Sequence, residues 1–182
     1  MRKADWSWLQ VDQVATASPE RARFELDKGL KAIDERLDVE VTDDDGTRTV
    51  VLTAGGEVEL FGLVHALVDS APSISRWRFV ALRPAGDFNF EIESGGLRFG
   101  VSSLTFQVID HDVPPGHLAI RLLVPNPQLP EWSDIALQII EVGLGEEAAA
   151  RIAHIEIDKR KPDSEGVYSL ESLPGYVARH TG

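Results

Sequence analysis

Apolar residues recur at helical spacing in three stretches of the chain. In the first, residues 18–37, Ser18 is suited to cap the helix and Pro19 to occupy its first position. The second stretch runs from roughly Glu57 to Ser70. The third begins near Pro130, and the residues expected on its buried face are Trp132, Ile135, Ala136, Ile139 and Val142. The positions that form the buried stripe of the first predicted helix are Leu26, Leu30, Ile33 and Leu37.

Alternation of apolar and polar residues predicts strands between these helices. The clearest case is 88–92, where phenylalanine and isoleucine alternate with asparagine and glutamate. The run Asp43–Gly46 predicts a tight hairpin turn, because Asp-Gly supplies the positive φ values that such turns require. Further strands are expected at residues 39–41, 47–53, 77–83, 97–99, 104–108, 118–124 and 155–157.

The order of these elements indicates the fold class. Successive strands joined by short turns favour antiparallel pairing. We therefore predict an α+β fold with a single domain over residues 1–158, a mainly antiparallel sheet and helices packed mostly on one face. Residues 57–108 are expected to form the centre of that sheet. The polar tail, residues 159–182, has a composition compatible with partial disorder. Two β-then-α units give the halves a faint similarity, without an internal repeat.

Composition narrows the functional classes. The chain has 182 residues, no cysteine, and 30 acidic against 18 basic residues, which gives a formal net charge of −12. This charge disfavours nucleic acids and anionic membranes as partners, because both bind through lysine and arginine. Two readings of the acidity remain open: solubility, and attraction to a basic protein partner. No apolar run is long enough for a membrane span and the N-terminus has no apolar signal segment, so we expect a cytoplasmic protein.

Candidate metal ligands occur in two places, and neither has the spacing of a known motif. Asp110, His111 and Asp112 lie near His117, but they flank a proline-rich turn where polar residues are expected. The three aspartates of 43–45 lack the alternating ligands of a calcium loop, so a solvated turn is the better interpretation. We assign no metal or cofactor ligand.

The candidate catalytic groups also lack the residues or spacing of a known catalytic motif. The segment 53–57 joins a strand to a helix but lacks the lysine of a phosphate loop, and Ser102 and Ser103 are not in a nucleophile elbow. Glu91 and Glu93 share one strand face and are interpreted as solvated. We assign no catalytic residue. The arginines of the central block are expected to pair with neighbouring acids rather than clamp an anion: Arg76, Arg78, Arg83 and Arg98.

Two segments carry a resemblance to known proteins. In the first, Leu63-Val64 and Ala71-Pro72 precede Trp77 and the run Phe79–Pro84; in the second, the helix over 140–146 ends in Leu-Gly-Glu. Together they resemble small uncharacterised bacterial α+β proteins. The resemblance implies a bacterial cytoplasmic α+β domain and supplies no site residues.

Three functional hypotheses follow. The first is a non-enzymatic interaction module, of an immunity or regulatory type, that binds a basic partner. The second is a small hydrolase or ligand-binding enzyme whose pocket is built from His65, Asp69, His111 or His117. The third is a homodimer formed through an exposed sheet face or edge. Trp6 and Trp8 are expected to dock within the molecule, the alternative being a partner surface.

Overall fold

The structure is a computed structural model that describes residue 6 and residues 9–94, 97–128, 131–159 and 165–180. The chain divides into two compact units, an N-terminal unit over Met1–Pro84 and a C-terminal unit over Ala85–Gly182. Each unit has its own sheet and its own cluster of buried apolar side chains. The predicted α+β class is confirmed. The single domain over residues 1–158 stays a prediction.

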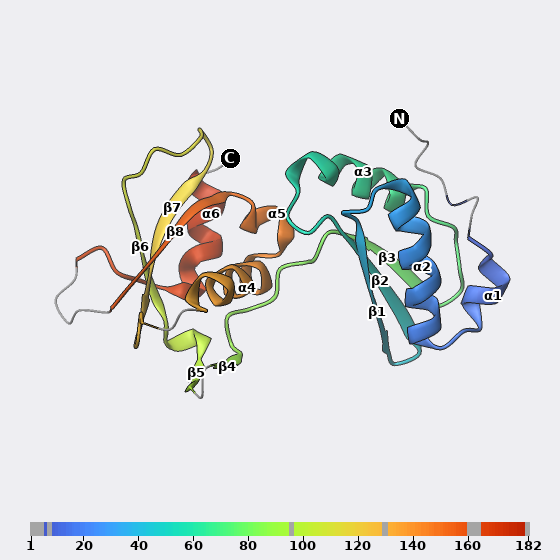
Figure 1. Ribbon diagram of the computed structural model, residues 1–182, viewed down its shortest axis with the longest axis horizontal. Coiled ribbons are helices and arrows are strands. Elements are labelled where there is room, and N and C mark those ends of the chain that lie inside the picture. Colours follow the sequence, from blue (N-terminus) through green and yellow to red (C-terminus); the bar gives the residue numbers. More distant parts are fainter. Residues whose placement is uncertain (1–5, 7–8, 95–96, 129–130, 160–164, 181–182) are drawn as a thin grey trace. The chain divides into compact units, whose positions relative to one another are not determined.

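The N-terminal unit packs helices on a three-stranded sheet (Figure 1). Its elements in chain order are α1 (Val11–Ala15), α2 (Pro19–Ile33), β1 (Asp38–Asp44), β2 (Thr47–Thr53), α3 (Val58–Asp69) and β3 (Trp77–Ala81). The hydroxyl of Ser18 accepts a hydrogen bond from the backbone N–H of Arg21, which caps α2 as predicted. The buried faces of α2 and α3 pack on the sheet in one core whose fully covered members include Leu26, Leu30, Val39, Val50, Val64 and Leu67.

The C-terminal unit holds a four-stranded sheet of order β8-β7-β6-β9 and a separate β4–β5 hairpin. Its elements in chain order are β4 (Glu91–Ser94), β5 (Leu97–Gly100), the 3-10 turn η1 (Val101–Ser103), β6 (Thr105–Val108), β7 (Leu118–Val124), α4 (Trp132–Leu144), α5 (Glu146–Ala149), β8 (Ile152–Lys159), β9 (Tyr168–Ser169), the 3-10 turn η2 (Leu170–Ser172) and α6 (Leu173–His180). Side chains from α4, α6 and one face of the sheet form the core, among them Phe106, Ile120, Leu122, Ile139 and Val177.

One topology occurs in both units. In each, an antiparallel pair of strands is followed by a helical crossover to a third strand that lies parallel to the second: β1-β2-α3-β3 and β6-β7-α4-α5-β8. A helix between two strands allows the chain to return and run in the same direction, which a short turn cannot do. The faint similarity of the halves in sequence therefore corresponds to a repeated arrangement of elements.

This topology corrects the predicted centre of one antiparallel sheet over residues 57–108. That block contributes strands to three separate sheets, and β3 pairs with β2 in parallel. The predicted strand 88–92 is shifted, because β4 begins at Glu91 and Phe88 precedes it as a buried residue that is 2% exposed. The alternation over 88–92 thus correctly predicted burial on one side of this segment, but it placed the start of the strand too early.

The described part of the C-terminal tail holds helical structure that the sequence patterns did not predict. This part, residues 165–180, forms β9, η2 and α6, and Leu170, Leu173 and Val177 are buried in the core of the C-terminal unit. These three residues have spacings of three and four, so they line one side of a helix. The polar composition of the tail concealed this short apolar stripe. Residues 160–164 and 181–182 lie outside the described residues.

Candidate interaction site at the edge of β8

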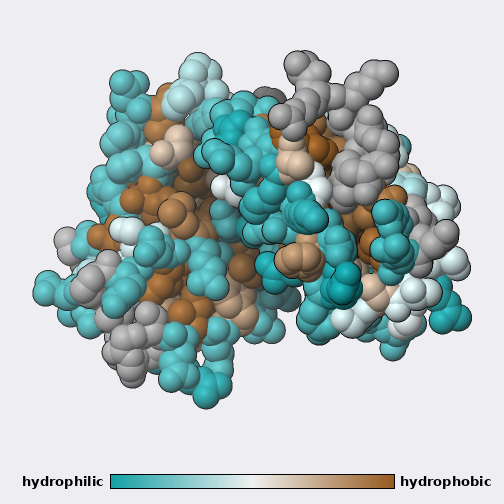
Figure 2. All heavy atoms as spheres, turned by 45° about the vertical axis from the view of Figure 1, so that its right-hand side comes forward, coloured by the Kyte–Doolittle hydropathy of each residue, from teal (hydrophilic) through white to brown (hydrophobic). Residues whose placement is uncertain are grey.

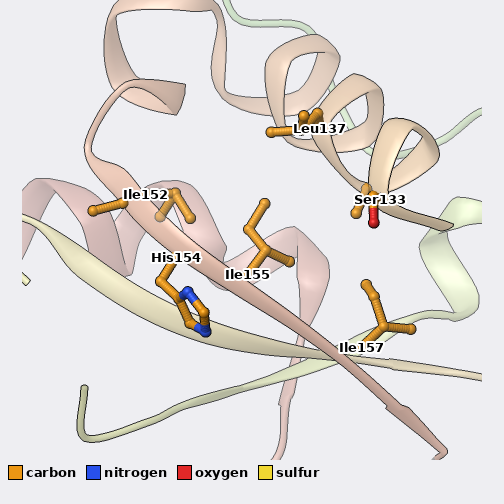
Figure 3. A pocket seen from close by; sticks show the side chains of 8 residues that line it. Ser133, Leu137, Ile152, His154, Ile155 and Ile157 are labelled. Carbon is orange, nitrogen blue, oxygen red and sulfur yellow. The ribbon is translucent and has the colours of Figure 1, made fainter. Parts of the chain in front are cut away.

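A hollow of about 230 Å³, lined by aliphatic side chains and by polar groups, lies between α4 and β8 in the C-terminal unit. Figure 3 shows Ile155 and Ile157 on the side of β8 that faces α4, with Leu137 and Ser133 across from them. The remaining lining residues are Ala136, Ile152, Ala153 and His154. Leu137 is a large apolar residue of α4, and it is 55% exposed. The hollow is therefore open to solvent and bordered by aliphatic side chains.

The strand that borders the hollow lies at the edge of its sheet. β8 pairs with β7 in parallel, and within the described residues no strand pairs with its other side. An edge strand presents main-chain N–H and C=O groups to which another extended segment can hydrogen-bond. Nearby, Ala153 is exposed at the start of this edge. The hollow and the open edge form one surface, which we call the β8 edge site: Ser133, Ala136, Leu137 and Ile152–Asp158.

The face of β8 opposite the hollow carries charge. Glu156 lies beside Arg121 of β7, and its Oε2 accepts hydrogen bonds from Nη2 at 2.7 Å and Nε at 2.9 Å. These bonds, together with the positive charge of Arg121 and of two nearby histidines, lower the pKa of Glu156 below its usual value. The carboxylate is therefore ionised at neutral pH. Because side chains alternate along a strand, Asp158 lies on the same face as Glu156.

Two histidines stack beside this carboxylate. The rings of His111 and His154 are nearly parallel, at 16°, with centroids 3.9 Å apart. The Nε2 of His154 lies 3.8 Å from Oε1 of Glu156. His111 comes from the connection between β6 and β7, so the stack joins that connection to β8. Within the described residues, no group of three or more histidine, aspartate or glutamate side chains is placed to hold a metal ion.

The residues proposed for an enzymatic pocket are divided between the two units, and only His111 contacts the β8 edge site, through its stack on His154. His65 and Asp69 are exposed on α3 of the N-terminal unit, while His111 and His117 belong to the C-terminal unit. None of the four lines the hollow between α4 and β8. The hydrolase hypothesis stays a prediction.

The other candidate residues lie in exposed positions. Asp43 to Asp45 are exposed at the β1–β2 hairpin, where Asp45 has the positive φ of 45° expected of a tight turn. Glu91 and Glu93 are both exposed on β4, and Glu91 pairs with Arg98 across the β4–β5 hairpin. Ser102 and Ser103 are exposed in η1.

The expected pairing of arginines with acids is confirmed for two of the four. The Nε of Arg83 lies 2.6 Å from Oε1 of Glu40, and Arg98 pairs with Glu91. Both pairs join strands or strand ends within one unit, so these arginines neutralise neighbouring carboxylates.

Trp6 docks within the molecule. It is 8% exposed, donates a hydrogen bond from Nε1 to the carbonyl of Leu67 at 2.8 Å, and makes an edge contact with Phe79 at a centroid distance of 5.2 Å. The prediction for Trp6 is therefore confirmed, and Trp8 lies outside the described residues. Trp132 is buried in the core, as its helical spacing predicted.

Sequence reasoning missed the β8 edge site. The strand was predicted only over 155–157, whereas β8 spans Ile152–Lys159. The alternation of isoleucine with histidine, glutamate and aspartate over 152–158 was the available signal, since it marks a strand with one apolar and one polar face. β8 has an unpaired edge because it is the first strand in the order of its sheet, and the pattern of residues along the chain does not reveal that order.

No protein-family model matches the chain, and no curated protein is significantly similar to it. Among the described residues, no helix is long and apolar enough to cross a membrane.

Proposed function

We propose that this protein is a non-enzymatic interaction module of the bacterial cytoplasm, of an immunity or regulatory type, that binds a basic partner protein. The observation that carries the proposal is the surplus of acidic side chains left after the arginines have paired within the molecule. The bacterial setting rests on the resemblance of residues 60–84 and 140–146.

Intramolecular ion pairs already engage much of the basic charge. Arg48 shows the pattern: its Nε lies 2.7 Å from Oδ1 of Asp43, and its Nη1 donates to the carbonyl of Ala17 at 2.9 Å. Among the described residues, the arginines that pair with a carboxylate in this way are Arg21, Arg36, Arg48, Arg83, Arg98 and Arg121. With 30 acids against 18 bases, pairing leaves the excess negative charge for the surface.

This excess is spread over exposed positions in both units. Figure 2 shows hydrophilic residues over much of the face drawn, with apolar residues reaching the surface between them. Exposed acids of the described residues include Asp44, Asp45, Glu93, Asp110, Asp112, Glu131, Asp134, Glu147 and Glu171. A negative surface of this kind steers a basic partner to the molecule and disfavours acidic ones.

Affinity capture tests the proposal. The full-length chain is immobilised, incubated with a bacterial lysate, and eluted by raising the ionic strength from about 0.1 M to about 1 M, which shortens the Debye length from about 10 Å to about 3 Å. We expect the eluted proteins to be dominated by basic chains. The partner should then bind the purified protein directly, with an affinity that falls as salt rises.

The control is a variant in which exposed acids are neutralised at positions outside the ion pairs. Glu93→Gln, Glu131→Gln and Glu147→Gln together remove three charges without touching any of the ion pairs named above. We expect this variant to retain less of the basic fraction. A captured set no more basic than that of a bait-free resin would contradict the proposed function.

A further inference from the structure

The edge of β8 is regular over most of its length. Native edge strands are commonly protected by lysine, proline or a bulge, which prevent another strand from pairing there. The run Ala153–Asp158 contains neither lysine nor proline, and Lys159 follows only at the end of the strand. The irregularity in the β7–β8 register makes Ala153 an extra residue of β8, because Leu118 pairs with Ile152 and Ala119 pairs with His154. From His154 onward the pairing is regular. The outer edge is thus able to accept a strand over the five residues that follow the bulge, His154 to Asp158.

The hollow gives this edge a preference for apolar side chains on one face. Its volume of about 230 Å³ exceeds that of cavities of about 150 Å³ that hold a benzene molecule, so an aliphatic side chain fits. Leu137, Ile155 and Ile157 would cover that side chain. Alternate side chains of a strand added beside β8 point toward this face of the sheet.

The opposite face prefers positive charge. Glu156 and Asp158 both lie there. Glu156 is paired with Arg121, whereas Asp158 has no ion pair among the described residues, and its Oδ1 accepts a hydrogen bond from the backbone N–H of Lys159. Side chains directly opposite each other on neighbouring strands interact, and opposite charges there are favourable. The alternate residues of an added strand should therefore be lysine or arginine on this face.

We infer that the β8 edge site binds an extended segment of a partner protein, with apolar and basic residues in alternation, as an added strand. The inference rests on the proposed function and states how the basic partner is recognised. Main-chain hydrogen bonds to the edge supply affinity, and the two unlike faces supply specificity.

A second copy of this chain is a poorer occupant. Antiparallel self-pairing centred on Glu156 would place two glutamates opposite each other, which is unfavourable. Self-pairing also brings together two chains that each carry a net charge of −12. Charge complementarity therefore favours a basic segment.

A defined peptide tests the inference with the full-length protein. The probe is a short fluorescein-labelled peptide that alternates valine and lysine, and binding is followed by fluorescence anisotropy. The control peptide has the same composition, with valines and lysines in separate blocks. We expect the alternating peptide to bind at least about tenfold more tightly, because only it can present one apolar and one basic face.

Two further forms of the peptide test the main-chain hydrogen bonds. In each, the amide nitrogens of every second residue are methylated, one form on the odd and the other on the even positions. Only one set of N–H groups can face β8, because successive amides of a strand point to opposite sides. We expect one form to lose binding and the other to retain it. Equal binding by both would overturn the added-strand geometry.

Variants of the protein have matched controls on the same elements. Leu137→Ser removes an apolar wall of the hollow, whereas Val142→Ser alters a residue of α4 that is 42% exposed and does not line it. Asp158→Lys reverses charge beside the edge, and Glu147→Lys does so on α5. We expect Leu137→Ser and Asp158→Lys to weaken binding about tenfold or more and Val142→Ser to bind like the wild type. Glu147→Lys should weaken binding far less than Asp158→Lys, because it changes the overall surface charge and not the charge beside the edge.

The outcomes separate this inference from the proposed function. A protein that captures basic partners in a salt-dependent manner but does not discriminate the peptides, or is insensitive to Asp158→Lys, retains the proposed function and loses the edge site. Light scattering that shows a dimer dissociated by Leu137→Ser, without peptide binding, assigns the edge to a second copy and overturns the inference.

Discussion

The packing of Phe88 against Gly143 makes a sharp stability prediction. Gly143 is buried on α4, and a Cβ atom added there would lie 2.1 Å from both Cε1 and Cζ of Phe88. Ordinary contact begins at 3.4 Å, so the ring would have to withdraw by 3.4 − 2.1 = 1.3 Å. Phe88 is 2% exposed, and the N–H of Gly86 donates to the carbonyl of Val142 at 2.9 Å, which holds this segment against the helix.

The magnitude follows from two opposing terms. Replacing glycine by alanine inside a helix gains up to about 1 kcal/mol in helix propensity. Forcing extra volume into a packed core costs about 1–3 kcal/mol, and more if a phenylalanine is displaced from it. We expect the packing term to prevail, because both ring atoms would be far inside contact distance. Gly143→Ala should lower the free energy of unfolding by about 1–2 kcal/mol.

Gly62 provides the matched control. It lies in the middle of α3, is exposed, and has no atom within 4 Å of an added Cβ. Gly62→Ala should therefore raise the free energy of unfolding by about 0.5–1 kcal/mol. The assay is urea denaturation of the full-length chain, followed by far-ultraviolet circular dichroism and by the fluorescence of Trp132, the tryptophan of the C-terminal unit.

Opposite signs for the two substitutions are the expected result. Combining Gly143→Ala with Phe88→Leu should recover part of the lost stability, because the smaller side chain makes room for the added methyl group. If Gly143→Ala stabilised the protein as much as Gly62→Ala, the close packing of Phe88 on α4 would be refuted.

Three further predictions concern hydrogen bonds and ionisation. Trp6→Phe removes the bond to the end of α3 and should cost about 1 kcal/mol in urea denaturation. A hydrogen bond with Tyr168 raises the pKa of Tyr176, so Tyr168→Phe should lower it in an ultraviolet titration of tyrosinate. Hydrogen bonds from Arg36 lower the pKa of Asp34 from 3.8 to about 2. The stability that ionised Asp34 contributes should therefore be present above pH 3.8 and lost as the pH falls toward 2. Asp34→Asn should abolish this pH dependence of stability, measured as the urea midpoint at a series of pH values.

Local patterns predicted the helices well. The cap at Ser18, the apolar face of α3 and most buried positions of α4 follow from spacing and capping chemistry, which act within a few residues. Val142 is the exception on α4, since it was expected on the buried face and is 42% exposed. Burial of Trp132 was predicted for the same reason. These features depend on interactions between near neighbours in the chain.

Features set by distant contacts were not predicted. The parallel pairing of β2 with β3 and of β7 with β8 depends on the path of the crossover helices, which alternation within a strand does not encode. The helix α6 was overlooked because its stripe has only three buried residues, counting Leu170 just before it, in a polar segment. Its burial becomes evident only from the core that it completes.

The candidate site likewise combines features that local patterns indicate with features that distant contacts determine. The two unlike faces of β8 can be derived from alternation in 152–158, but the exposure of its edge requires the strand order. The stacking of His111 on His154 joins residues of separate elements, so no local motif signals it. Alternation along the sequence therefore indicates which residues share a face of β8, but it does not indicate that the strand lies at the edge of its sheet.

Hydrogen exchange followed by mass spectrometry tests the central claim most directly. The full-length protein is labelled with and without a saturating amount of the alternating valine–lysine peptide. We expect exchange to slow in the segment His154–Asp158, because an added strand engages the outward amides of β8. Unchanged exchange in that segment, at a peptide concentration shown to saturate binding, would contradict the claim that β8 is the recognition edge.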